Sequence, residues 1–134
     1  MKFVCESGYL PNKAHENDGG IDLRSAEDKV VKARDCAVFD TKTRFQIPHG
    51  YAGLLVSKSG LNMKGLTSTG LIDCGYTGTV QVKLYNNSDE DYHVKAGDKI
   101  SQMVVLPIYN GKLEQVDTLE DTERGENGFG SSGR

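Results

Sequence analysis

The sequence contains no tryptophan and no long hydrophobic run. No segment approaches the roughly 20 consecutive apolar residues that a membrane-spanning helix needs, so we expect no membrane association. Residues 1–6 lack the apolar stretch of a signal peptide. The cysteines, Cys5, Cys36 and Cys74, are odd in number and widely spaced, which matches neither a disulfide framework nor a zinc site. These absences predict a reduced, cytoplasmic setting.

An excess of basic charge is also lacking. Lysine and arginine number 16 against 19 aspartate and glutamate residues, which gives a net charge of −3. Proteins that bind nucleic acid are usually basic, so we expect no general nucleic-acid binding. A small anionic ligand would have to be bound by a local cluster of cations and backbone amides.

Glycine, in contrast, is abundant. The 16 glycines among 134 residues indicate many tight turns, which favours an all-β fold. Short apolar or alternating segments recur at intervals of about 8 to 12 residues, the spacing of a sandwich or barrel. The length predicts one domain. The only helix expected is a short one that starts near Ser59 and ends in a helical turn stopped by Gly65.

The most informative stretch is residues 70–78, Gly-Leu-Ile-Asp-Cys-Gly-Tyr-Thr-Gly. Its last two glycines predict a tight bend with positive φ angles, and residues 80–84 alternate between apolar and polar. We therefore expect a β-hairpin with Asp73 and Tyr76 near its tip. Such a carboxylate can accept a proton from water, and the ring can pack against a flat ligand. Alternatively, Asp73 stabilises the turn and Tyr76 packs across the strands.

A candidate anion site follows the apolar strand expected at residues 51–56. A short helix starting near Ser59 would point free backbone amides outward, beside a serine hydroxyl and Lys58. The alternative is a capped helix start beside an exposed lysine. Gly60 and Gly65 have the spacing of a P-loop, but the Lys-Ser/Thr pair is missing, which excludes that motif.

Two polar side chains lie in segments expected to be strands. Asp22 is either a solvated strand residue or a carboxylate at the edge of a metal or phosphate site. Gln102 lies in the apolar run 100–108. Because buried amides need partners, Gln102 either bonds to the backbone or faces a ligand.

The last eleven residues, 124–134, change sharply in composition. They match Gly-x-Gly-x-x-Gly at Gly128, Gly130 and Gly133, but no strand precedes them, which excludes a dinucleotide-binding fold. This segment is either a disordered tail or an arm that becomes ordered when Phe129 stacks and its cations and hydroxyls bind an anion.

Taken in order, five segments resemble the motifs of the trimeric dUTPases (dUTP diphosphatases). They are residues 19–26, 58–61, 70–78, 97–103 and 124–133. The resemblance implies an all-β, jelly-roll-like β-barrel over residues 1–123 and a flexible C-terminal arm over 124–134 that closes over the active site. It also implies a homotrimer with active sites at subunit interfaces. The implied reaction is Mg²⁺-dependent hydrolysis of dUTP to dUMP and pyrophosphate, which limits uracil incorporation into DNA and supplies dUMP for dTMP synthesis.

The resemblance also implies roles for individual residues. Asp73 would be the general base, and Asp22 would hold Mg²⁺ through waters. Tyr76 would leave no room for a ribose 2′-hydroxyl. The base and sugar would be bound by Thr67, Gly70, Tyr76, Gln81 and Phe129. The phosphates would be bound by Lys58, Ser59, Gly60, Gln102, Arg124, Gly130, Ser131 and Ser132.

The chain departs from the family pattern at Ser57 and Lys58, where members usually have Pro-Arg. Lysine cannot make the bidentate phosphate contact of arginine. Ile21 and Gly75 replace a frequent aromatic and a frequent acidic residue. Two other functions stay open: a dCTP deaminase on a similar fold, which would release ammonia, and a regulatory protein that senses dUTP.

Overall fold

The computed structural model describes residues 1–130 and 132–133, and within them nearly all regular structure is β. The elements in chain order are β1 (Lys2–Cys5), β2 (Ile21–Arg24), β3 (Lys29–Val31), β4 (Cys36–Asp40), β5 (Thr43–Gln46), β6 (Tyr51–Val56), α1 (Ser59–Met63), β7 (Leu66–Thr67), β8 (Thr69–Ile72), β9 (Gln81–Asn86), β10 (Tyr92–Val94) and β11 (Lys99–Pro107). No helix among the described residues is long and apolar enough to cross a membrane.

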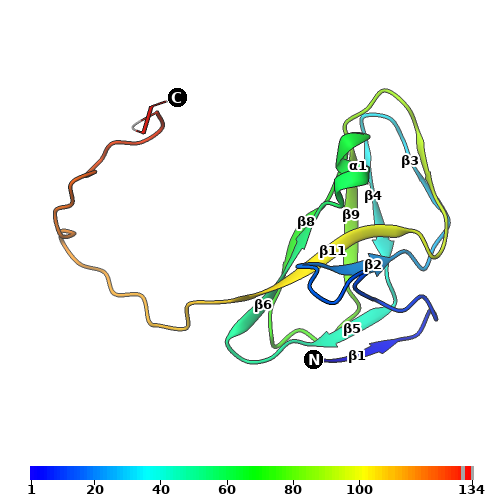
Figure 1. Ribbon diagram of the computed structural model, residues 1–134, viewed down its shortest axis with the longest axis horizontal. Helices are drawn as coiled ribbons and strands as arrows, with labels where there is room; N and C mark the ends of the chain where they lie inside the picture. Colours follow the sequence, from blue (N-terminus) through cyan, green and yellow to red (C-terminus); the bar gives the residue numbers. More distant parts are fainter. Residues whose placement is uncertain (131, 134) are drawn as a thin grey trace.

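The strands pair antiparallel in several small sheets (Figure 1). The largest has the order β2-β11-β6-β8, and a second has the order β4-β9-β7; β1 pairs with β5, and β10 with β3. Neighbours in these sheets are mostly distant in sequence, as in a jelly roll. The sheets do not close into a continuous barrel, but the all-β, jelly-roll-like class is confirmed.

The hydrophobic core lies between the two larger sheets. Strand β9 alternates strictly, so that Val82 and Leu84 are fully buried while the residues between them are exposed. They pack in one cluster with Phe39 of β4, Leu55 of β6 and Met103 of β11. The period-two pattern of residues 80–84 is thus a half-buried strand, as predicted.

The hairpin predicted around residues 70–78 is wrong. Strand β8 pairs with β6, whereas β9 pairs with β4 and β7, so residues 73–80 cross from one sheet to the other. The predicted positive φ angles are absent at both Gly75 and Gly78. Gly78 instead lies close against the Tyr76 ring, since a Cβ there would lie 2.5 Å from the Tyr76 hydroxyl oxygen.

The short helix is confirmed. It spans Ser59–Met63, and Gly65 follows in the left-handed region with φ +85°. The Gly65 amide donates to the Asn62 carbonyl at 2.9 Å, which closes the end of the helix. Glycine has no Cβ penalty in this conformation, so it ends the helix as expected.

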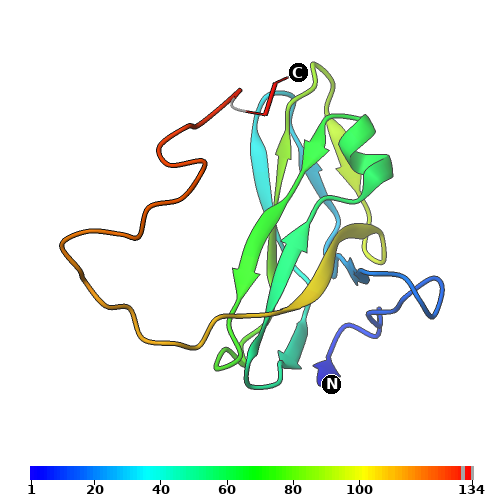
Figure 2. The same ribbon diagram turned by 60° about the vertical axis from the view of Figure 1, so that its left-hand side comes forward.

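The C-terminal segment leaves the body after β11 and extends away from it without forming a strand (Figures 1 and 2). The Ile108 amide donates to the Gly50 carbonyl at 2.9 Å; among the described residues, later backbone bonds in the chain are local to the segment. Residues 109–130 are all exposed. The boundary after residue 123 stays a prediction, and the exposed segment begins before it.

Candidate active site

Antiparallel register brings three predicted site residues together on the four-stranded sheet. Asp22 of β2 lies opposite Gln102 of β11, which lies opposite Val56 of β6. Lys58 follows two residues after Val56 and therefore reaches the same end of the sheet. We call Asp22, Lys58, Gln102 and the nearby Lys99 the Asp22 cluster.

Asp22 is the electrostatic centre of this cluster. Lys58 Nζ pairs with its Oδ1, and Lys99 Nζ lies 2.7 Å from its Oδ2. The residue is only 4% exposed. Burial by itself raises the pKa of Asp22, but hydrogen bonds and charge from the two lysines outweigh it and hold the pKa below its ordinary value. Asp22 is therefore an ionised, doubly paired carboxylate.

The Gln102 amide makes a backbone hydrogen bond, which is the first of the two roles that the sequence left open, and its contact with a phosphate stays a prediction. Its Nε2 donates to the Ser57 carbonyl at 3.1 Å. Its Oε1 side lies against Gly20, where an added Cβ would collide with the amide. Gly20 thus leaves room for the amide of Gln102 beside Asp22.

Ser59 and Gly60 form the first turn of α1 and are both exposed. The Asn62 amide donates to the Lys58 carbonyl at 2.8 Å, which places Lys58 at the start of the helix. The first amides of any helix have no partner within it. The local geometry therefore leaves amides of Ser59 and Gly60 next to the Asp22 cluster.

The turn that carries Asp73 and Tyr76 is exposed. Asp73 directly follows β8, and the Tyr76 amide donates to its carbonyl at 3.1 Å. The Tyr76 hydroxyl donates to the Thr79 carbonyl at 2.9 Å, which folds the ring over Gly78. Asp73 is exposed, so its carboxylate is open to water.

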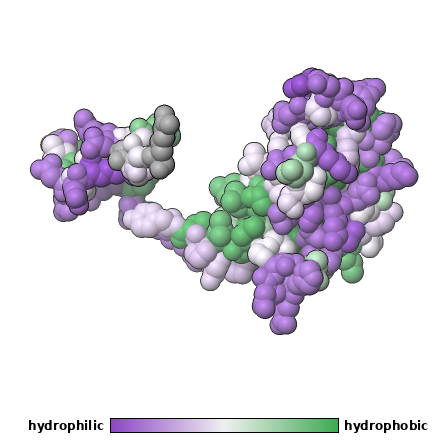
Figure 3. Space-filling view, turned by 45° about the horizontal axis from the view of Figure 1, so that its top comes forward, coloured by the Kyte–Doolittle hydropathy of each residue, from purple (hydrophilic) through white to green (hydrophobic). Residues whose placement is uncertain are grey.

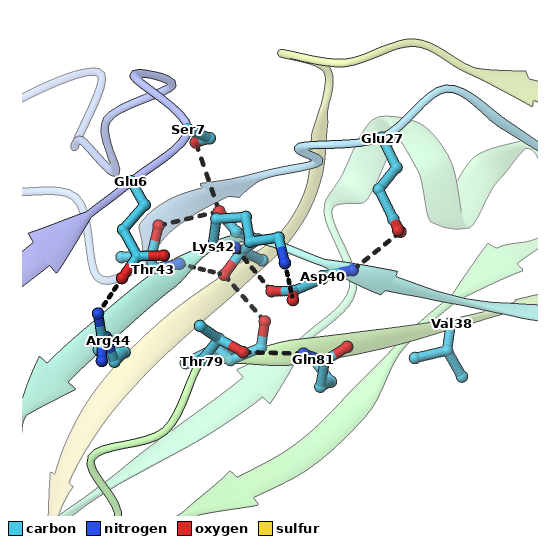
Figure 4. A network of polar contacts seen from close by, with 12 residues as sticks. Glu6, Ser7, Glu27, Val38, Asp40, Lys42, Thr43, Arg44, Thr79 and Gln81 are labelled. Atoms are coloured by element: carbon cyan, nitrogen blue, oxygen red, sulfur yellow. Dashed lines mark hydrogen bonds and ion pairs between the residues drawn. The ribbon is translucent and has the colours of Figure 1, made fainter.

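Gln81 joins this turn to a polar network around the β4–β5 connection (Figure 4). Its Nε2 donates to Thr79 Oγ1 at 3.0 Å. In the same network, Asp40 pairs with Lys42 at 3.0 Å and its backbone amide donates to Glu27. The network supports the turn that carries Tyr76, and contact of Gln81 with a nucleotide stays a prediction.

Thr67 and Gly70 are close in sequence but lie in different sheets. Thr67 pairs with Tyr85 in the β7–β9 ladder, and Gly70 lies opposite Leu55 of β6. The chain crosses between the sheets at the buried Ser68, whose hydroxyl lies 2.8 Å from that of Ser101. Contact of Thr67 and Gly70 with the base stays a prediction.

The arm residues lie apart from these groups. Phe129 is fully exposed, and Arg124 Nε donates to the Asn127 carbonyl at 2.8 Å within the arm itself. Gly130 and Ser132 are also in this exposed segment, whereas Ser131 lies outside the described residues.

The Asp22 cluster and Asp73 lie at opposite ends of β8. Thr69, at one end of β8, is opposite Val56, close to Lys58. Asp73 lies beyond Ile72, at the other end. Three residues of strand span about 10 Å. A single chain thus assembles the Asp22 cluster but holds the proposed base well away from it.

The described residues include no group of three or more His, Cys, Asp or Glu side chains that could hold a metal ion. Both carboxylate oxygens of Asp22, the residue predicted to hold Mg²⁺ through waters, are engaged by lysines. Mg²⁺ usually keeps several waters and binds through substrate phosphates. The residues therefore fit an ion carried by a polyphosphate, and not a metal site made of protein ligands alone.

Sequence reasoning did not assign a role to Lys99. The residue lies within the matching segment 97–103. In a regular strand, however, Lys99 would face the core together with Ser101 and Met103. An irregularity in β11, which no sequence pattern announces, changes that side.

Comparison with known proteins decides the family. The dUTPase family model matches residues 6–133. The chain belongs to the dUTPase family. It is 39% identical to the deoxyuridine 5′-triphosphate nucleotidohydrolase of Clostridium acetobutylicum, over 99% of this chain and 94% of that protein. The protein of the same name from Tropheryma whipplei is also 39% identical, over 100% and 95% of the two chains.

Solved structures agree with this assignment. The dUTPase of Staphylococcus bacteriophage 80alpha with dUpNHpp has a TM-score of 0.91 and 33% identity, over 99% of this chain and 98% of that chain. A mutant dUTPase from phage phi11 of S. aureus, described for its coordination of a structural Mg(II) ion, has a TM-score of 0.81 and 31% identity, over 90% and 98%.

Proposed function

We propose that this dUTPase cleaves dUTP between the α- and β-phosphates to give dUMP and pyrophosphate, with Asp73 as the general base. Removal of dUTP would limit uracil incorporation into DNA, and the dUMP produced would supply dTMP synthesis. The observation that carries the residue assignment is the exposed Asp73 carboxylate, which directly follows β8 in the turn that also carries Tyr76.

Asp73 would take a proton from the water that attacks the α-phosphorus. A general base must be reachable by that water, and the exposed carboxylate meets this requirement. The hydrogen bond from the Tyr76 amide to the Asp73 carbonyl holds the backbone of the turn. The position of the Asp73 backbone in turn limits where its carboxylate can point.

Tyr76 would pack against the deoxyribose and exclude a 2′-hydroxyl. The phenol hydroxyl donates to the Thr79 carbonyl, which holds the outer end of the ring. Backbone and side chains on either side of this turn would bind the uracil edge, which assigns this part of the site to Thr67, Gly70 and Gln81.

The phosphates would be bound by two sets of residues. Lys58, Ser59, Gly60 and Gln102 belong to or adjoin the Asp22 cluster, where two lysines outnumber one carboxylate. The arm, residues 124–134, would close over the nucleotide, with Phe129 covering the uracil. Its phosphate contacts would come from Arg124, Gly130, Ser131 and Ser132.

A homotrimer with sites at subunit interfaces would complete this arrangement. Beside the Asp22 cluster, Val104, Leu54 and Leu71 form a row across β11, β6 and β8 on the side away from the core. Leu71 is 64% exposed. Hydrophobic surface also gathers where the arm leaves the body (Figure 3). Another copy covering this row would lie next to the phosphate-binding residues and could supply the distant base and arm.

Mg²⁺ carried by the triphosphate would neutralise charge that builds up on the phosphates. Asp22 would contact the waters of that ion, in keeping with its ionised state. The three cysteines are free thiols, which supports a reducing compartment such as the cytoplasm.

Pyrophosphate and ammonia release, measured in parallel with dUTP, dCTP, dTTP and UTP in the presence of Mg²⁺, tests the function. We expect pyrophosphate from dUTP far faster than from the others, and no ammonia. Ammonia from dCTP would replace the proposal with a deaminase. Equal rates with dUTP and UTP would contradict the role of Tyr76.

A further inference from the structure

The Asp22 cluster contains a lysine that the proposed mechanism does not use. Lys99 Nζ lies 2.7 Å from Asp22 Oδ2, while Lys58 holds the other oxygen. The Asp22 side chain is 5% exposed, whereas those of Lys58 and Lys99 are 27% and 34% exposed. One buried carboxylate thus anchors two ammonium groups that both reach the surface, with one positive charge in excess.

An irregularity in β11 places Lys99 there. Ser101 pairs with Leu23 and Gln102 with Asp22, but the register shifts between Lys99 and Ser101. In a regular strand Lys99 would share the core-facing side of Ser101. The extra residue is Ile100, which is buried in the core. The shift therefore turns Lys99 to the side of Gln102, as bulges beside functional sites often do.

Two lysines held in this way can do what one cannot. An ammonium group has three donors and binds as a point charge, so a single lysine lacks the paired donors of a guanidinium group. Lys58 stands where family members usually have arginine. With Asp22 between them, Lys58 and Lys99 offer donors to a phosphate from two fixed positions.

We propose that Lys99 binds the β- and γ-phosphates of dUTP together with Lys58, and that Asp22 is the positioning residue that holds both lysines. This inference rests on the proposed function, since it assigns Lys99 to the same triphosphate. The distal phosphates are the ones concerned because Asp73, which acts at the α-phosphorus, is not part of the Asp22 cluster. The competing role for Lys99 is to neutralise the buried Asp22 only.

Calorimetric binding of dUMP, dUDP and dUpNHpp separates the two roles. For Lys99→Gln we expect affinity for dUpNHpp to fall about tenfold, as for loss of one charge-assisted contact, and affinity for dUMP to change less than twofold. Lys99→Arg should bind dUpNHpp within about threefold of wild type. Lys95→Gln is the matched control, since it removes the same charge from the preceding turn, and it should bind all three nucleotides as wild type does.

Equal losses for the three nucleotides in Lys99→Gln, or none, would overturn the proposal. A measurement on the wild-type protein avoids any folding defect of the variants. The side-chain ammonium NMR signal of Lys99, assigned by its loss in Lys99→Arg, should shift on addition of dUpNHpp and not of dUMP. An unchanged signal would also overturn it. Failure of the wild-type protein to bind dUpNHpp or hydrolyse dUTP would instead contradict the proposed function.

Discussion

The Asp22 cluster and the C-terminal arm are both proposed to bind phosphates, yet the cluster is preformed and the arm is not. The cluster is fixed by the register of β2, β11 and β6 and by two ion pairs on a buried carboxylate. The arm belongs to a segment that is exposed throughout residues 109–130, and the Phe129 side chain is fully exposed. Binding to the cluster therefore requires little ordering, whereas binding to the arm includes the entropy cost of ordering it.

This difference assigns separate tasks to the two regions. A preformed cluster can hold the substrate before closure, and an arm that orders afterwards can exclude water and complete the site. The turn that carries Asp73 is intermediate in order between the cluster and the arm, since its backbone is fixed but its carboxylate remains open to solvent. Variants in the three regions should therefore affect chemistry, closure and stability separately.

The greatest effect is expected for Asp73→Asn. An amide cannot accept the proton of the attacking water, so kcat should fall about 10³-fold, within the usual range for loss of a general base. Affinity for dUpNHpp should stay within about twofold, because the Asp22 cluster is unchanged. Single-turnover kinetics and calorimetry measure the two quantities. Normal turnover by this variant would remove Asp73 from the mechanism.

Truncation after Glu123 should have the next largest effect. Loss of the stacked ring, worth roughly 1–3 kcal/mol by analogy with base–aromatic stacking, and of the Arg124 charge should lower kcat/KM about 10²-fold. The melting temperature and the oligomeric state should not change, because residues 124–130 are exposed. Gly128→Ala, where an added Cβ meets nothing within 4 Å, is a control within the arm. Unchanged kinetics after truncation would make the arm a disordered tail.

Asp22→Asn should mainly lower stability, by about 2 kcal/mol, because two charge-assisted hydrogen bonds to a buried group are lost. The folded pKa of Asp22 is depressed, so its stabilisation is complete above the unfolded pKa of about 3.9 and is lost as pH falls through the lower folded value. The difference between wild type and variant, from urea unfolding, should be constant from about pH 5 to 8 and shrink below about pH 4.

Asp89→Asn is the control for that prediction. Asp89 pairs with Arg34 at the surface, where its side chain is 84% exposed. Exposed pairs contribute little, so the free energy of unfolding should change by less than about 0.5 kcal/mol. Equal effects of the two substitutions would mean that burial of Asp22 adds nothing to its ion pairs.

The sequence predicted those features that depend on neighbours along the chain. The alternation of residues 80–84, the helix that begins at Ser59 and its end at Gly65 all follow from local periodicity and glycine chemistry. The structure brings Asp22, Gln102 and Lys58 together, but their roles stay predictions, made from the order of the matching segments and not from any local signal.

Pairing between distant strands could not be predicted in the same way. Glycines at 75 and 78 indicate a bend, but nothing in them tells whether the next strand returns to β8 or joins another sheet. The position of Lys99 depends on the irregularity at Ile100, which is visible only once β2 and β11 are paired. Both failures concern partners far away in sequence, where one-dimensional patterns carry little information.

Gly78→Ala should give the smallest effect, and it tests how the fixed turn produces specificity. A Cβ at residue 78 would lie 2.5 Å from the Tyr76 hydroxyl oxygen, so the ring must move and its bond to the Thr79 carbonyl must break. Loss of one exposed neutral hydrogen bond, about 1 kcal/mol, should reduce the preference for dUTP over UTP about fivefold. Gly75→Ala is the control, since residue 75 lies in the same turn and a Cβ there meets nothing within 4 Å. This variant should keep the wild-type preference for dUTP over UTP. If both variants lost selectivity equally, the conformation of the turn, and not the position of the Tyr76 ring, would exclude the ribose.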